Sequence, residues 1–140
     1  MVFVMEYERP QEKMKALYEA YKKGLEEGRF TSMRHACRLI SKMPAPSFFI
    51  SAKEAAQYIG RIEQGFSLID LSSSKRRLML QLYKDYKAYL AEHPGCSLPR
   101  EIIMEELVDR PAPEFYMKPE AVRGVLRTAI RNVRKEMGWE

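Results

Sequence analysis

Met14-Lys15-Ala16-Leu17-Tyr18-Glu19-Ala20-Tyr21-Lys22 and Met79-Leu80-Gln81-Leu82-Tyr83-Lys84-Asp85-Tyr86-Lys87 follow one pattern, M-x-x-L-Y-x-x-Y-K, at an offset of 65 positions. A second pair follows in the same order. Pro44-Ala45-Pro46-Ser47-Phe48-Phe49 corresponds to Pro111-Ala112-Pro113-Glu114-Phe115-Tyr116 at an offset of 67, and a two-residue insertion near His93-Pro94-Gly95 accounts for the difference. Two ordered matches at nearly equal spacing predict an internal duplication, in which one structural unit is used twice.

The first copy predicts two helices before its Pro-Ala-Pro segment. Pro10 suits a first helical turn, and Gly28 suits the end of that helix. Thr31 or Ser32 can cap a second helix that runs to about Met43.

Each Pro-Ala-Pro segment ends a helix, because proline has no N–H to donate and disfavours helical backbone in the residue before it. The segments Phe48–Ile50 and Phe115–Met117 then predict short extended stretches. We expect their rings in the core, since aromatic residues at such spacings usually fill interiors. Ser51 with Glu54 forms an S-x-x-E capping box for a third helix, and Pro119 opens its counterpart.

The second copy repeats this plan, with helix caps expected at Ser72–Ser74 and at Ser97. The predicted fold is therefore mainly α: two tandem three-helix repeats, residues 6–66 and 72–138, each with a short extended aromatic segment between its second and third helices. The connection Gly65–Ser74 is short and partly apolar, which favours packing of the repeats together as one compact protein.

The composition is that of a globular, basic protein. Of the 140 residues, 46% are hydrophobic and 31% charged, and the net charge is +5. No apolar run approaches the ~20 residues of a membrane span, and Met1–Met5 is too short for a signal peptide. Cys37 and Cys96 fall at unmatched places in the repeats, so we expect free thiols in a reducing cytoplasm.

The second helices of the two copies differ in charge. Arg34, Arg38 and Lys42 share one face of the first, at i, i+4 and i+8. The positions 67 residues further on are acidic: Glu101, Glu105 and Asp109. Three interpretations follow: two solvated faces that diverged independently, pairing of the basic with the acidic face within or between chains, or a specialised unit that contacts a polyanion.

The last helix carries a further basic stripe. Four arginines fall within an arc of about 80° by the helical period: Arg123, Arg127, Arg131 and Arg134. Guanidinium groups match phosphate oxygens well, so this stripe favours phosphate contacts, with a solvated face as the alternative. A helix-turn-helix with Arg34, Arg38 and Lys42 on its recognition helix is a further alternative, which the acidic second copy does not fit.

No assembled catalytic or metal site is visible in the sequence. There is no glycine-rich phosphate loop, G-x-S-x-G, H-E-x-x-H or C-x-x-C motif. His35 and Cys37 diverge by about 160° on a helix, so they form no local pair. We therefore expect no enzyme activity, no metal and no cofactor.

The duplicated PAP-x-[FY]-[FY] segment resembles one in small uncharacterised bacterial proteins that are often found near phage or mobile elements. The resemblance covers most of the chain, implies an accessory role in mobile DNA, and brings no known activity or site residues.

We therefore expect a non-enzymatic cytoplasmic protein that binds DNA or RNA through the seven basic residues above. The alternative is an adaptor or self-associating protein that uses Glu101, Glu105 and Asp109 to bind its own basic face or another protein.

Overall fold

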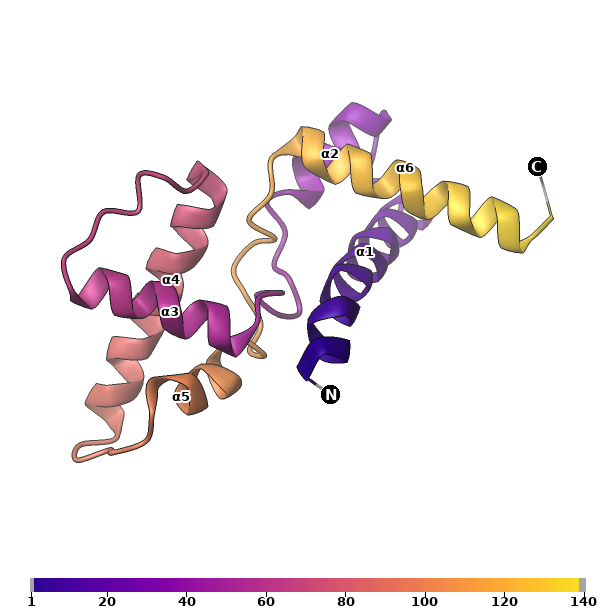
Figure 1. Cartoon of the computed structure of the whole chain (residues 1–140). Coiled ribbons are helices and arrows are strands. Elements are labelled where there is room, and N and C mark those ends of the chain that lie inside the picture. The colour runs from indigo at the N-terminus through magenta and orange to yellow at the C-terminus, as the bar shows by residue number, and fades with distance from the viewer. Residues whose placement is uncertain (1, 139–140) are drawn as a thin grey trace. The chain divides into compact units, whose positions relative to one another are not determined.

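Six α-helices form the secondary structure of the part of the chain that the structure describes (Figure 1). The structure is a computed structural model, which describes the backbone of residues 2–138 and the side chains of residues 10–138. The helices are α1 (Val2–Glu26), α2 (Met33–Ile40), α3 (Ala52–Glu63), α4 (Ser73–Glu92), α5 (Arg100–Leu107) and α6 (Pro119–Glu136). The prediction of a mainly helical fold is confirmed.

Serine caps begin three of the helices, as their sequence positions predict. The Ser32 hydroxyl accepts a hydrogen bond from the backbone N–H of His35 at 3.1 Å. Ser51 accepts from Glu54 at 3.0 Å, and Ser72 accepts from the third residue after it at 3.2 Å. Each cap satisfies one of the backbone donors that a helix leaves unpaired at its N-terminus.

Three predicted helix boundaries were wrong. α1 begins at Val2 and contains Pro10 in its interior rather than in its first turn. α2 ends at Ile40, and the next residues form a turn rather than a helix running to Met43. α5 begins at Arg100 after Pro99, whose fixed backbone starts the helix in place of a Ser97 cap.

The two aromatic segments are not continuous extended stretches, as the sequence predicted, because each contains one residue with left-handed backbone. Phe49 and Tyr116 both have left-handed backbone, with φ of 54° and 55°. Bulky residues rarely adopt this conformation, because Cβ crowds the neighbouring carbonyl. The preceding residues, Phe48 and Phe115, are buried, which holds this backbone in place. The same left-handed backbone therefore occurs at the two positions that the sequence aligns.

The chain divides into two compact units that cut across the predicted repeats. Unit 1 is Met1–Ala45 with Pro113–Glu140, and unit 2 is Pro46–Ala112. Consequently α6 packs on α1 and α2, whereas α3 packs on α4 and α5. Each predicted repeat contributes its first two helices to one unit and its third helix to the other, and the chain crosses between units inside each Pro-Ala-Pro segment. We call this arrangement the helix exchange.

The buried positions of the two units correspond at the repeat offset. Leu17 of α1 and Leu82 of α4 are both fully buried. The buried residues of α2 and of α5 match one for one: Ala36 with Ile103, Cys37 with Met104, and Ile40 with Leu107. On the third helices, Ala55 and Ile59 of α3 match Val122 and Leu126 of α6. The exchanged third helices thus present equivalent apolar faces to equivalent partners.

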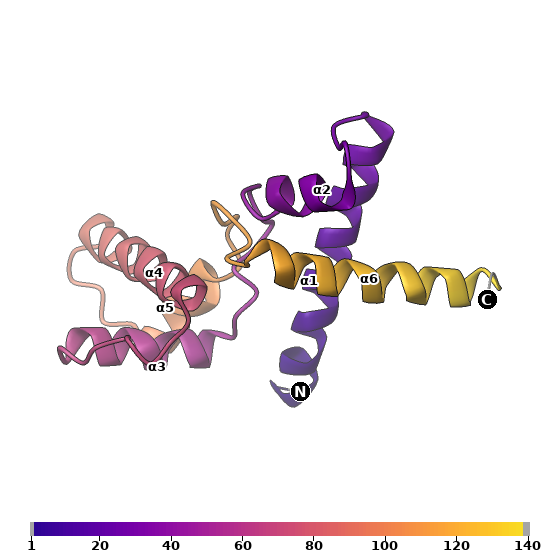
Figure 2. The ribbon, with the colours of Figure 1, turned by 90° about the horizontal axis from the view of Figure 1, so that it is seen from above.

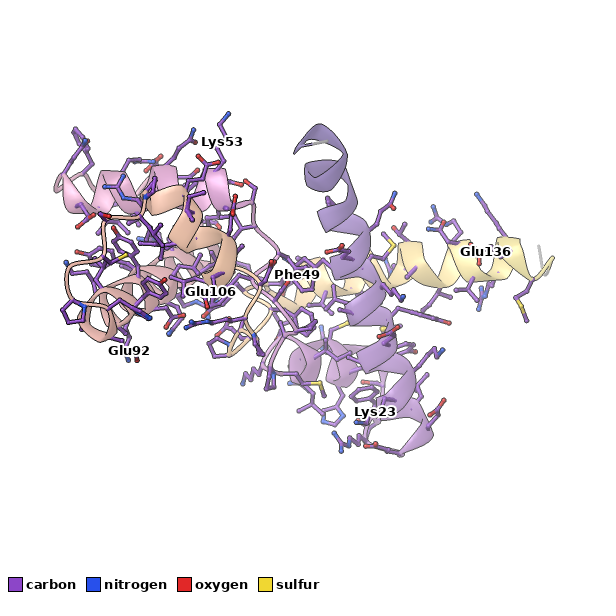
Figure 3. The ribbon with its side chains drawn as sticks, turned by 90° about the horizontal axis from the view of Figure 1, so that it is seen from below. Lys23, Phe49, Lys53, Glu92, Glu106 and Glu136 are labelled. Carbon is purple, nitrogen blue, oxygen red and sulfur yellow. The ribbon has the colours of Figure 1, made fainter. Side chains whose placement is uncertain are left out.

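Within unit 1, α1 crosses α6 and α2 lies beside the first half of α6 (Figure 2). The buried residues of α6 end at Ala129. Its last turns, where Glu136 is labelled, extend past α1 (Figure 3). The C-terminal part of α6 is therefore a projecting helix with exposed side chains.

Candidate nucleic-acid interface

The basic side chains of α2 point away from the core. Ala36, Cys37 and Ile40 form its buried face, and this leaves Arg34 and Arg38 exposed on the opposite side. Lys42 is also exposed, and lies two residues beyond the helix end in a turn closed by its N–H to the Leu39 carbonyl at 3.1 Å. The predicted basic face thus exists, although its third member follows the helix rather than belonging to it.

The arginines of α6 are exposed along its whole length. Val122, Leu126 and Ala129 are the buried residues of this helix. All four arginines are exposed: Arg123, Arg127, Arg131 and Arg134. From the first to the last they span about 16 Å at a rise of ~1.5 Å per residue. Together they lie within one arc of the helix surface.

The helix exchange brings the two basic stripes into one unit. α2 comes from the first predicted repeat and α6 from the second, yet they pack against each other in unit 1. Cys37 of α2 lies at this contact: burial raises the pKa of its thiol, while the positive charges of Arg123 and Arg127 partly oppose the rise. Because those charges reach the Cys37 thiol, Arg123 and Arg127 lie near the contact between α6 and the buried face of α2, which sequence order alone did not predict.

The docking of α6 predicts that Cys37 reacts slowly. A protonated, shielded thiol is a poor nucleophile, so alkylation by iodoacetamide at neutral pH should proceed at least about tenfold more slowly at Cys37 than at half-exposed Cys96. Peptide mass spectrometry over time measures both rates, and the Cys37 rate should rise with pH. Equal rates in the folded protein would contradict a docked α6.

The net charge of the protein resides entirely in unit 1. Unit 1 contains 15 of the 24 Lys and Arg residues and 10 of the 19 Asp and Glu residues, a difference equal to the whole net charge of +5. Unit 2 contains the remaining nine of each sign and is neutral. A polyanion would therefore be attracted to unit 1.

Unit 2 also pairs several of its own cations. Its described ion pairs include Arg61–Asp70 at 2.9 Å, Lys75–Glu54 at 2.6 Å, Arg100–Glu63 at 3.3 Å, Lys87–Glu63 at 3.9 Å and Arg110–Glu106 at 3.5 Å. By contrast, none of the seven basic residues on α2, its following turn and α6 forms an ion pair with a residue whose side chain the structure describes.

The positions equivalent to the seven basic residues carry no positive charge in unit 2. On α5 and the turn after it they are the exposed acidic residues Glu101, Glu105 and Asp109. On α3 and the loop after it they are Ala56, Gly60, Gln64 and Ser67. Two units of matching buried pattern thus differ at all seven positions, always with the positive charge in unit 1. The predicted partner-binding acidic face is exposed, but it belongs to the other unit.

A shallow, open hollow lies beside the projecting part of α6. Its volume is about 290 Å³, and its described lining residues are Arg127, Ile130, Arg131 and Arg134. Three guanidinium groups around one apolar side chain suit a phosphate with an adjacent apolar group. The hollow is part of the same basic stripe.

The histidines and cysteines do not assemble a chemical site in the described part of the chain. The ring of His35 accepts a hydrogen bond from the Thr31 N–H at 3.1 Å, and His93 stacks on Tyr89 with ring centroids 4.2 Å apart. Both cysteines are free thiols. Among the described residues, no three His, Cys, Asp or Glu side chains are grouped to hold a metal ion, and no helix is long and apolar enough to cross a membrane.

The connection between α1 and α2 bears on the helix-turn-helix alternative. α1 ends at Glu26 and α2 begins at Met33, which leaves residues 27–32 between them. This is longer than the ~3–4-residue turn of that motif. The structure therefore gives the alternative no support.

Comparison with known proteins identifies no relative. No family model matches the chain, no curated protein matches it, and no solved structure matches it.

Proposed function

We propose that this protein binds nucleic acid through a basic surface on unit 1, formed by α2 with its following turn and by α6, and that it catalyses no reaction. The contacts are to phosphate groups, from Arg34, Arg38, Lys42, Arg123, Arg127, Arg131 and Arg134. The two free thiols support action in a reducing compartment such as the cytoplasm.

One observation carries this proposal. The helix exchange collects seven exposed basic residues from two sequence-distant segments in one unit, and the equivalent positions of the other unit are acidic or uncharged. Unit 1 thereby carries the whole net charge of +5 whereas unit 2 is neutral, which favours a polyanion at unit 1 over two faces that are merely solvated. The tandem repeat itself is part of the proposal, supported by the shared buried positions and by the left-handed backbone at Phe49 and Tyr116.

The proposal predicts salt-sensitive binding of a labelled mixed-sequence DNA duplex, measured by fluorescence anisotropy. With up to seven phosphate contacts, the slope of log K against log salt approaches about −6, so affinity falls on the order of 1,000-fold between ~50 and ~200 mM salt. The double variant Arg123→Gln/Arg127→Gln should reduce the magnitude of this slope by about 2. It should also weaken binding roughly 10- to 100-fold at ~0.1 M salt.

Unit 2 supplies a matched control for this experiment. Lys53→Gln with Lys84→Gln removes the same charge from exposed positions of unit 2 and should leave affinity and slope nearly unchanged. Equal losses in both double variants would show attraction by net charge alone. No binding of wild type at ~50 mM salt would reject the proposal.

A second candidate function is protein–protein adaptation. It is favoured by the exposed acidic stripe Glu101, Glu105 and Asp109, which matches the basic stripe of α2 in spacing and opposes it in sign. Such a match orients two partners, although each exposed ion pair stabilises a complex by only about 0.2–1 kcal/mol.

A further inference from the structure

Gly124 lies in the middle of α6, where glycine weakens a helix. The residue is exposed, and apart from its two chain neighbours and the helix's own backbone no described atom lies within 4 Å of the position that a Cβ would occupy. Packing against the side chains that the structure describes therefore gives no reason for a glycine here. A residue that costs helix stability without an internal packing role suggests a requirement from outside the chain.

The other glycines inside described helices have neighbouring atoms at the position that a Cβ would occupy. A Cβ on Gly24 of α1 would collide with the ring of Phe30, and one on Gly60 of α3 would come within 3.0 Å of Nη1 of Arg100. The position of α3 that corresponds to Gly124 is occupied by exposed Gln57. The helix scaffold itself thus accepts a long side chain at this position.

Gly124 also lies beside the arginine stripe. By the helical period it is about 20° from Arg131 and about 60° from Arg127 around the axis, on the side turned away from Leu126. The Thr128 hydroxyl donates a hydrogen bond to the Gly124 carbonyl at 3.2 Å, which draws that side chain against the helix. At Gly124 and Thr128, therefore, no long side chain projects from α6. We call this short-side-chain surface the low spot, and the arginine stripe borders it.

We propose that α6 lies in the major groove of duplex DNA, with this low spot as its point of closest approach and its arginines on the phosphates that border the groove. This inference rests on the proposed function and adds the ligand class and the contacting helix. A helix with its side chains is about 10–12 Å wide, and the major groove is about 12 Å wide. A helix face with short side chains can therefore enter the groove more deeply. The major groove of duplex RNA is too deep and narrow for such entry.

The test uses the full chain with two substitutions, Gly124→Ala and Gly124→Gln, and one labelled ~20-base-pair DNA duplex. Both substitutions should raise the melting temperature, Gly124→Ala by about 3–5 °C, because each replaces an exposed helix glycine. Gly124→Gln should weaken duplex binding at least tenfold while keeping the salt slope, since it removes no phosphate contact. The matched control Gln57→Gly should bind as wild type.

The outcomes separate this inference from the proposed function. Wild-type affinity in Gly124→Gln, together with weakened binding in Arg123→Gln/Arg127→Gln, would overturn the groove contact and leave the phosphate-binding proposal standing. Duplex RNA or single-stranded DNA of the same sequence bound as tightly as duplex DNA would also overturn it. No binding of any of the three nucleic acids by the wild type would reject both.

Discussion

A variant in which α2 and α5 exchange their charged residues should lose most of its affinity for nucleic acid, although its composition and its net charge of +5 are unchanged. The substitutions are Arg34→Glu, Arg38→Glu, Lys42→Asp, Glu101→Arg, Glu105→Arg and Asp109→Lys. In this variant the three moved cations lie in unit 2, whereas the α6 arginines remain in unit 1. Three contacts leave the proposed surface, so we expect a loss of more than roughly 100-fold at ~0.1 M salt.

The core should tolerate these exchanges. All six positions are exposed, while the buried residues of the two helices are at other positions of the repeat. The described ion pairs of α5 use Arg100, Glu106 and Arg110, which are unchanged. Placing arginine in the first turn of α5 opposes the helix dipole and costs about 0.3–1 kcal/mol. Circular dichroism and thermal melting check that the variant folds.

The charge-exchange variant also separates the two candidate functions. It keeps one basic and one acidic face, so self-association through complementary faces should persist. The half-variant with only Arg34→Glu, Arg38→Glu and Lys42→Asp has two acidic faces, and self-association should be lost. Sedimentation velocity measures association and anisotropy measures DNA binding. Wild-type DNA affinity in the charge-exchange variant would contradict a surface shared by α2 and α6.

The sequence predicted helix caps and helix ends correctly where they depend on residues only a few positions apart. The hydroxyl caps at Ser51 and Ser72 form as predicted, because capping depends on residues three positions apart. Gly28 has the predicted left-handed backbone at the end of α1, with φ of 66°. The aromatic segments were misjudged as extended, since a left-handed Phe49 is set by the packing of its neighbours rather than by its own preference.

The arrangement of the helices could not follow from the repeat pattern. Because α3 and α6 carry equivalent buried residues, such as Ile59 and Leu126, either helix offers a matching face to either helix pair. Only the tertiary structure shows which pairing occurs. For this reason the sequence identified both basic stripes but not their presence in the same unit. Within the sequence, the difference between the copies was visible only as the absence of positive charge at the positions that correspond to the seven basic residues.

The helix exchange predicts that a protein cut between its repeats stays together. A protease site inserted after Gly65, in the exposed connection between α3 and α4, separates α1–α3 from α4–α6. Unit 1 then needs α6 from the second fragment, and unit 2 needs α3 from the first. Two separate packed interfaces therefore join the fragments. After complete cleavage they should elute as one species of unchanged mass in size-exclusion chromatography with light scattering.

Two equivalent substitutions provide the control. Ile59→Ala weakens the docking of α3 in unit 2, and Leu126→Ala weakens that of α6 in unit 1. Each removes a fully buried side chain and costs about 2–5 kcal/mol, so the cut protein carrying both should dissociate at low micromolar concentration, whereas the uncut double variant stays one chain. If each repeat instead folded on itself, the cut wild type would separate into two folded halves. In that case α2 and α6 would belong to different fragments, and no single unit would hold all seven basic residues.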